Sequence, residues 1–238
     1  MQNSTLINQS VSKETTNAIY LITRYIGVLM GVFSSINHGI FEILQGNQKT
    51  SGILIQAIGI NQRFWINGTE EAFAIIPNYL VSGILTVITG IAIVIWSLKY
   101  LDSKHGTMVF LALFIISFLN GGGIGQLAFF VPAWAFGRLM HSPLVWWKDH
   151  LPEGSWHALS KLWQPLLLIA TLSFLVGLEI AIFGYFPGLT NPLVLQNTAM
   201  QLVFGAALLV IFSYVGGIAN QLQLSYKKNE PLLNWRKL

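Results

Sequence analysis

The chain has 238 residues, of which 53% are hydrophobic and only 9% are charged. An average soluble domain is roughly one-quarter charged, so this composition excludes an ordinary water-soluble protein. The net charge of +4 is not a nucleic-acid signature, because the 13 Lys and Arg residues are scattered along the chain. The lack of cysteine excludes disulfides, thiolate catalysis and Cys-ligated metals.

Long blocks without any Asp, Glu, Lys or Arg predict membrane-spanning helices. About 20 predominantly apolar residues are enough to cross the hydrocarbon core of a bilayer. Helices are expected instead of barrel strands, because the blocks lack strand-like alternation and backbone groups in lipid must be hydrogen-bonded internally. The charge-free blocks are residues 72–98, 106–137, 162–178 and 189–226.

The first predicted span covers residues 18–44 and carries a polar stripe. At 100° per residue, eight of its side chains fall within a sector of about 100°. Because polar and ionisable side chains do not face lipid cheaply, the stripe is expected to face other protein or an internal cavity. The stripe consists of Arg24, Gly27, Gly31, Ser34, Ser35, His38, Glu42 and Gln45.

The ionisable members of the stripe require more explanation than packing. Arg24 lies about 21 Å of helix rise from His38 and is expected to extend toward the lipid headgroups. His38 and Glu42 are one helical turn apart, which predicts a direct hydrogen bond and a shared proton. The same spacing suits a metal ion, but two ligands alone are a weak signal, and no metal site is predicted.

The second predicted span, residues 75–98, follows a long loop at 45–74. The loop contains enough Ile, Phe and Trp to lie on the bilayer surface or to cap the bundle. One face of the second span is small and hydroxylated, and small residues let membrane helices approach closely. This face is therefore expected to pack against the glycines and serines of the first span. Its members are Asn78, Ser82, Thr86, Thr89 and Gly90.

Three consecutive glycines at 121–123 interrupt the block of residues 104–140. Glycine is a poor helix former, so the block is one long broken helix, two short helices that meet at a glycine turn, or a re-entrant pair. With crossings at 104–120 and 123–140 and a cytoplasmic amino terminus, eleven Lys and Arg residues lie inside and two outside. A single crossing gives at best nine inside and four outside. The positive-inside rule favours the double crossing.

Two further spans are predicted at residues 162–186 and 198–222. Glu179 lies within the first of them, among apolar residues. A carboxyl group there must be protonated, paired with another helix or placed at the wall of a cavity. If it is paired, the candidate partner is His38 or Arg24, and the sequence does not distinguish between them.

Together these features predict a single all-α integral membrane domain, a bundle of about six transmembrane helices with five as the alternative. It is expected in the plasma membrane with both termini cytoplasmic. No catalytic residue is assigned and no cofactor is expected. The candidate residues for binding or for proton handling are His38, Glu42, Glu179, Arg24, Ser35, Asn120 and Gln126.

The leading functional hypothesis is the binding or transport of a small or lipidic molecule through an internal polar pocket, with proton linkage. One alternative is a membrane-embedded enzyme that acts on a lipid, isoprenoid or quinone-like substrate, with His38 and Glu42 as acid and base. Another is a noncatalytic membrane subunit or assembly factor. The expected partners are membrane lipids, the ligand, and a protein partner or a second copy of the chain; nucleic acid is not among them.

Overall fold

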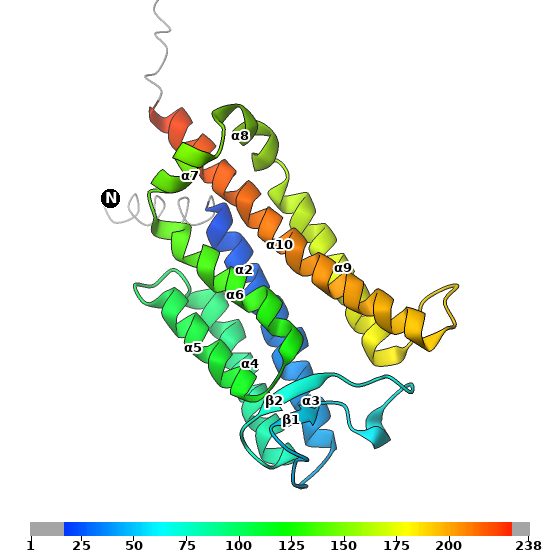
Figure 1. Ribbon diagram of the computed structural model, residues 1–238. Helices are drawn as coiled ribbons and strands as arrows, with labels where there is room; N and C mark the ends of the chain where they lie inside the picture. Colours follow the sequence, from blue (N-terminus) through cyan, green and yellow to red (C-terminus); the bar gives the residue numbers. More distant parts are fainter. Residues whose placement is uncertain (1–16, 230–238) are drawn as a thin grey trace, which may run out of the picture.

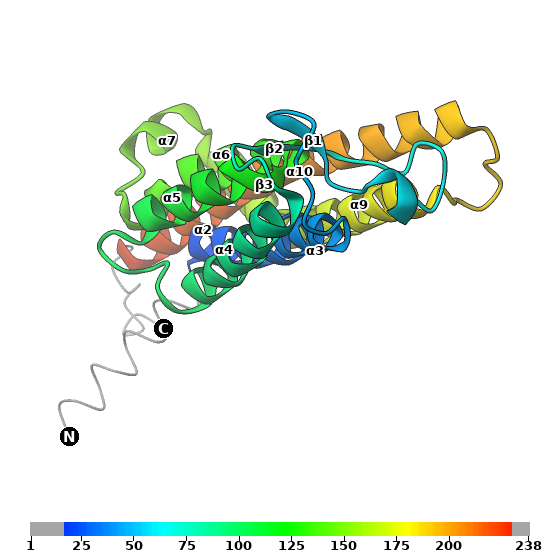
Figure 2. The ribbon, with the colours of Figure 1, turned by 90° about the horizontal axis from the view of Figure 1, so that it is seen from below.

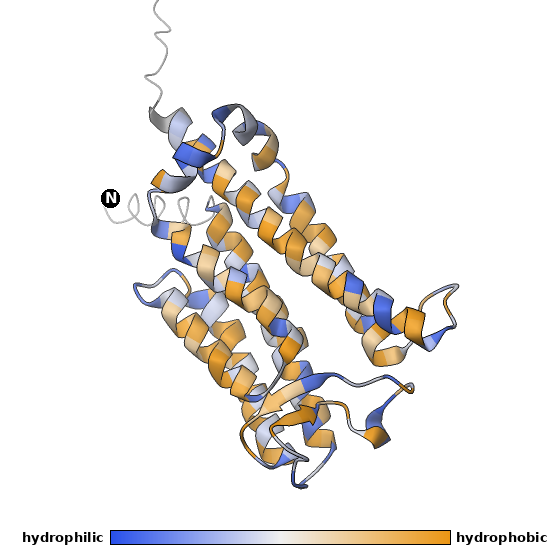
Figure 3. Cartoon of the chain, viewed as in Figure 1, coloured by the Kyte–Doolittle hydropathy of each residue, from blue (hydrophilic) through white to orange (hydrophobic). Residues whose placement is uncertain are grey.

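The computed structural model describes residues 17–229 and is an all-α membrane bundle (Figure 1). Hydrophobic residues cover the bodies of the helices, and hydrophilic residues gather toward the two ends (Figure 3). The start of the first helix and the end of the last lie at the same end of the bundle (Figure 1). Four helices are long and apolar enough to cross a membrane: Ala18–Leu44, Tyr79–Lys99, Trp163–Phe183 and Pro192–Tyr226.

The first span consists of three helical segments in series and has the predicted bounds. They are α2 (Ala18–Met30), the π-helical turn η1 (Gly31–Ile36) and α3 (Asn37–Leu44). The side chain of Asn17 accepts a hydrogen bond from the backbone N–H of Tyr20 and so caps α2. A π turn accommodates an extra residue, which rotates the face of the following helix by about 100°.

Helix α4 (Tyr79–Lys99) packs closely along the first span. A Cβ atom added to Gly83 would lie 2.6 Å from the carbonyl oxygen of Gly39, and one added to Gly39 would lie equally close to that of Gly83. Farther along, a Cβ on Gly90 would lie 2.9 Å from the carbonyl oxygen of Gly31. The contact between Gly90 and Gly31 confirms the predicted packing of small residues, whereas Gly39 and Gly83 were not on the predicted faces.

The glycine-interrupted block folds as two short antiparallel helices joined by a turn (Figure 1). These helices are α5 (Gly106–Leu119) and α6 (Leu127–Gly137). Between them lie the strand β3 (Asn120–Gly123) and a 3-10 turn, η3 (Ile124–Gln126). The alternative of one long broken helix is wrong, because the chain reverses direction at the glycines.

A small antiparallel sheet caps the end of the bundle where α5 and α6 meet, and sequence analysis predicted no strand here. The loop after α3 supplies β1 (Leu54–Gln56) and β2 (Glu71–Ala74), with the 3-10 turn η2 (Ile60–Gln62) between them. Strand order is β1-β2-β3, so the glycine strand is an edge of the sheet. The sheet, which we call the cap, thus joins a loop outside the helices to the α5–α6 turn.

Two short helices, α7 (Val145–His150) and α8 (Glu153–Ser160), precede the final hairpin of α9 (Trp163–Phe183) and α10 (Pro192–Asn229). Helix α9 ends before the predicted residue 186, because Gly184 adopts a left-handed conformation with φ of 65°.

The α9–α10 hairpin contacts the other helices mainly at the end opposite the cap. There the Tyr214 hydroxyl donates a hydrogen bond to Thr23 Oγ1 at 3.0 Å, and Gly217 faces Ile22. Toward the cap the hairpin diverges from the other helices and extends beyond them (Figures 1 and 2). The divergence leaves room for the cleft described below.

Replacing Gly83 by alanine tests the close contact between α3 and α4. The added methyl group has to displace backbone, so we expect a loss of about 1–3 kcal/mol of stability, seen as a lower melting temperature in detergent. Gly205→Ala in α10 is the matched control, since a Cβ there meets nothing within 4 Å. Helix propensity alone favours alanine by about 1 kcal/mol, so equal melting temperatures for the two variants would contradict the contact.

Candidate functional site

A buried histidine and a loop glutamate form an ion pair at the cap end of the first span. His38, on α3, is hydrogen-bonded through Nε2 to Oε2 of Glu70. The His38 side chain is 5% exposed and that of Glu70 is 26% exposed. Glu70 immediately precedes β2, and its carbonyl oxygen accepts a hydrogen bond from Ala57 at 2.9 Å, so the cap holds this residue over α3.

The charge balance at Glu70 follows from this geometry. Burial alone raises the pKa of the Glu70 carboxyl group, because the ionised form loses hydration. The charge of His38 and the hydrogen bond from its ring outweigh burial and hold the pKa of Glu70 below its ordinary value. Glu70 is thus an anion placed against the His38 ring at the end of a transmembrane helix.

Glu42 lies one turn beyond His38 and is fully buried. The Ser82 hydroxyl, on α4, lies 2.7 Å from Glu42 Oε2, where it donates a hydrogen bond. The same hydroxyl also lies within hydrogen-bonding distance of the Asn120 carbonyl oxygen, which in addition accepts from Thr86 Oγ1 at 2.6 Å. The other carboxyl oxygen of Glu42, Oε1, has no partner among the described residues. The group is therefore held on one side only.

The three glycines of β3 allow its backbone to pass directly against these side chains. A Cβ atom on Gly121 would lie 2.2 Å from Glu42 Oε1, and one on Gly123 would lie 2.4 Å from Cε1 of the His38 ring. At Gly122 the nearest atom would be Nε2 of Gln126, also at 2.2 Å. Gly121 in addition has a φ of 120°, which side chains disfavour. Close approach to buried side chains therefore favours glycine at all three positions, most clearly at Gly121, where the backbone conformation also disfavours a side chain.

His38, Glu42 and Ser82 form a buried polar layer, and two further buried polar side chains extend it. Ser35, on η1, accepts a hydrogen bond from the Ser117 hydroxyl at 2.8 Å. Gln126 is 2% exposed, and neither its amide nitrogen nor its amide oxygen has a partner among the described residues. A buried amide without partners is costly, so Gln126 is suited to bind a ligand or a water molecule.

A cleft of about 630 Å³ opens beside His38 and Glu70, between the first span, the cap and the α9–α10 hairpin. Its polar end includes His38, Glu70, Arg63 and Gln126. Its volume is within the range usual for ligand pockets. The opposite wall is apolar and comes from α9 and α10: Phe174, Leu178, Met200, Val203 and Phe204.

One segment of the loop, residues 63–69, connects the cap to the α9–α10 hairpin, and we call it the strap. Trp65 Nε1 donates a hydrogen bond to the Ala181 carbonyl oxygen at 3.0 Å, and the indole ring lies against Gly184. Asn67 Nδ2 donates to Gln196 Oε1 at 3.3 Å. The strap therefore bridges the cleft at its cap end.

The predicted hydrogen bond between His38 and Glu42 is wrong, because each side chain has a different partner. The ring of His38 is hydrogen-bonded to Glu70, and the carboxyl group of Glu42 accepts a hydrogen bond from Ser82. The prediction considered only residues on one helix, whereas the cap and α4 bring closer partners.

Arg24 and Glu179 do not join this site. The Arg24 guanidinium lies 6.0 Å from the centre of the Tyr20 ring, and η1 breaks the uniform helical projection that placed it on the face of His38. Glu179 is exposed on α9, about 100° around the helix from the cleft residue Leu178, and has no hydrogen bond or ion pair with a described residue. The expected pairing of Glu179 with His38 or Arg24 is therefore wrong.

The other sequence candidates lie at or near the site. Ser35 belongs to the buried polar layer, Gln126 lines the cleft, and Asn120 contributes its backbone carbonyl instead of its side chain. Sequence reasoning missed Glu70. A signal was available, because a buried imidazole needs a hydrogen-bond partner, and Glu70 and Glu71 are the only acidic residues of the loop at 45–74.

No protein-family model matches this chain, and no curated protein or solved structure is significantly similar to it. Function must therefore be argued from the geometry and chemistry of the site.

The Glu70 ion pair predicts an acid-dependent loss of stability. Because the pKa of Glu70 is lower in the folded chain, the pair stabilises the fold above the ordinary glutamate pKa of about 4.3, and this contribution is lost as the pH falls through the folded-state value. We expect wild type to melt above Glu70→Gln at pH 6 in detergent, and the difference to shrink as the pH falls below about 4.

Glu71→Gln is the control for this comparison, since Glu71 is an exposed neighbour without an ion pair to any described residue. It should melt like wild type throughout. A constant difference between wild type and Glu70→Gln at every pH would show that the carboxylate charge contributes nothing.

Proposed function

We propose that this protein binds, and moves within the membrane, an amphipathic lipidic molecule that occupies the cleft beside His38. The observation that carries the proposal is the composition of the cleft, which has an ion pair and a buried amide at one end and aromatic and aliphatic side chains along the rest. A ligand with a hydrogen-bonding head and an apolar body matches both parts.

The polar end offers groups that a ligand head can use without breaking the fold. Gln126 has an unpartnered donor and acceptor, and Arg63 Nε is also unpartnered among the described residues. These atoms are buried in the structure, so a ligand head forms hydrogen bonds with them only after the lining side chains shift. Such recognition selects strongly against analogues that lack the matching polar group.

The His38–Glu70 ion pair supports linkage of this binding to protons. A ligand group that hydrogen-bonds to the His38 ring competes with Glu70, and the strength of the pair depends on whether the ring is charged. Ligand and proton therefore influence each other's binding at the same ring, and the coupling is reciprocal.

We also propose that the protein lies in the plasma membrane with the cap outside and both termini in the cytoplasm. Within the described chain, Lys49 and Arg63 are the only Lys and Arg residues of the cap end, whereas the other end carries the remainder. This asymmetry has the sign that the positive-inside rule requires.

Filling the cleft tests the binding proposal. Met200→Trp places a larger side chain at a half-exposed position of the cleft wall. We expect at least fivefold less lipidic ligand to co-purify with this variant from membranes. The amount of bound ligand is measured by native mass spectrometry. Leu208→Trp is the matched control, because Leu208 is exposed on α10 outside the cleft. Equal ligand retention by both variants would contradict the proposal.

Proton linkage is tested by His38→Gln, which keeps a hydrogen-bonding group but removes the titratable ring. Binding or proteoliposome uptake of the co-purifying lipid is expected to depend on pH in wild type and to become flat between pH 5 and 8 in the variant. A variant with an unchanged pH profile would show that another group titrates.

A membrane-embedded enzyme is the second candidate, because a carboxylate that orients an imidazole at a cleft wall is an acid–base arrangement. This alternative requires chemical turnover of the bound lipid by the purified protein. His38→Ala should then abolish conversion while the cleft still retains the lipid, whereas a binding or transport protein converts nothing in either form.

A further inference from the structure

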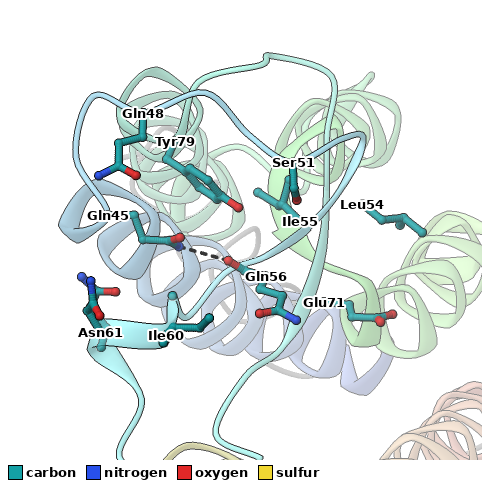
Figure 4. A pocket seen from close by; sticks show the side chains of 12 residues that line it. Gln45, Gln48, Ser51, Leu54, Ile55, Gln56, Ile60, Asn61, Glu71 and Tyr79 are labelled. Atoms are coloured by element: carbon teal, nitrogen blue, oxygen red, sulfur yellow. Dashed lines mark hydrogen bonds between the residues drawn. The ribbon is translucent and has the colours of Figure 1, made fainter.

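A second pocket, of about 530 Å³, lies in the cap and plays no part in the proposed function (Figure 4). It is formed by the end of α3, the strands β1 and β2, the turn η2 and the start of α4. Five of its twelve lining residues carry neutral amides, and Tyr79 adds an aromatic ring. The amide residues are Gln45, Gln48, Gln56, Asn61 and Gln62.

The charge of this lining limits what it can bind. Every carboxamide both donates and accepts hydrogen bonds, as a hydroxyl group does. Glu71 is the only charged side chain in the lining, and no Lys or Arg is part of it, so an anionic ligand would meet a like charge without compensation. Arg63 reaches the Gln56 amide oxygen, but from the side of the cleft.

Two of the amides are fixed in place by the backbone. Gln45 Nε2 donates hydrogen bonds to the carbonyl oxygens of Gln56 at 3.0 Å and Ala57 at 2.7 Å, and the first of these is drawn in Figure 4. Gln62 Nε2 donates to the Leu44 carbonyl oxygen at 3.1 Å. Their amide oxygens are left as positioned acceptors, and such preorganisation lowers the entropic cost of binding.

A glycine allows these two amides to converge. A Cβ atom on Gly59 would lie 2.5 Å from Gln62 Oε1 and 2.8 Å from Gln45 Oε1. Any side chain at this position would push the amides apart. The pocket therefore combines paired acceptors, further amides and the ring of Tyr79, whose face is apolar and whose hydroxyl is polar.

From these observations we propose that the cap pocket binds a neutral carbohydrate. Sugar hydroxyl groups match amides that donate and accept, and the C–H faces of a sugar ring match the apolar surfaces of Tyr79 and Ile60 in the lining. The volume is sufficient for a small saccharide. In the membrane orientation proposed above, the pocket faces the outside of the cell.

The carbohydrate has two possible sources, a free saccharide or the headgroup of a glycolipid. The two pockets share a wall, because Gln56 and Glu71 are opposite each other in the β1–β2 pair and line both. A glycolipid headgroup in the cap pocket would therefore lie next to the cleft that we assign to a lipidic ligand. Both sources present the same hydroxyl chemistry to the amides.

The test measures binding of the full chain, purified in nanodiscs, to an array of neutral mono-, di- and trisaccharides. A parallel arm uses nanodiscs that contain glucosyl diacylglycerol, with diacylglycerol as the comparison, read by native mass spectrometry. We expect at least one neutral saccharide or the glycolipid to bind. Gln45→Leu and Gln62→Leu should each weaken that binding at least tenfold, and Gln201→Leu, an exposed glutamine of α10 outside both pockets, should not.

The outcomes separate this inference from the proposed function. Binding in the saccharide array alone identifies a free sugar as the ligand, and retention of the glycolipid alone identifies a headgroup; either supports the proposal if the Gln45 and Gln62 variants lose it. Absence of binding in both arms, preference for sugar phosphates, or binding unaffected by both variants overturns it. Met200→Trp fills only the cleft, so free-sugar binding should survive that substitution even where lipid binding is lost.

Discussion

Placing His38 and Glu42 inside a transmembrane helix is the constraint on which the rest of this structure depends. Ionisable groups at that depth are expensive unless other polar groups surround them. Three parts of the chain meet the requirement. The loop before β2 supplies Glu70, α4 supplies Ser82, and the glycine strand β3 passes close to both buried side chains. The cap, the α5–α6 turn and the first two spans are consequently organised around one polar layer.

The membrane character, the approximate positions of the long helices and part of the packing of the first two spans could be predicted from sequence, because they depend on local hydrophobicity and on residue size. The bounds of the first span and the small residues on α4 are examples. The partners of His38 and Glu42 could not be predicted in this way. Each lies 30 to 40 residues away along the chain, and helical periodicity carries no information about such distant contacts.

Sequence analysis also did not predict the turn η1 and the strand β3, for two different physical reasons. The π turn η1 has no distinctive composition, yet it rotates the helix and separates Arg24 from the buried polar layer. The strand β3 consists of residues that disfavour strands, so propensity argued against it. Its pairing is stabilised instead by β2 on one side and by the close approach of α3 on the other. In both places tertiary contacts determine the backbone conformation.

The strap that bridges the cleft is held to the α9–α10 hairpin by an indole N–H, a pair of carboxamides and the packing of a ring on a glycine. None of these contacts involves a formal charge, whereas the site beneath them does. Counter-ions screen interactions between exposed charges and leave neutral hydrogen bonds nearly untouched. The attachment of the strap to the hairpin is therefore insensitive to the ionic strength of the surrounding medium.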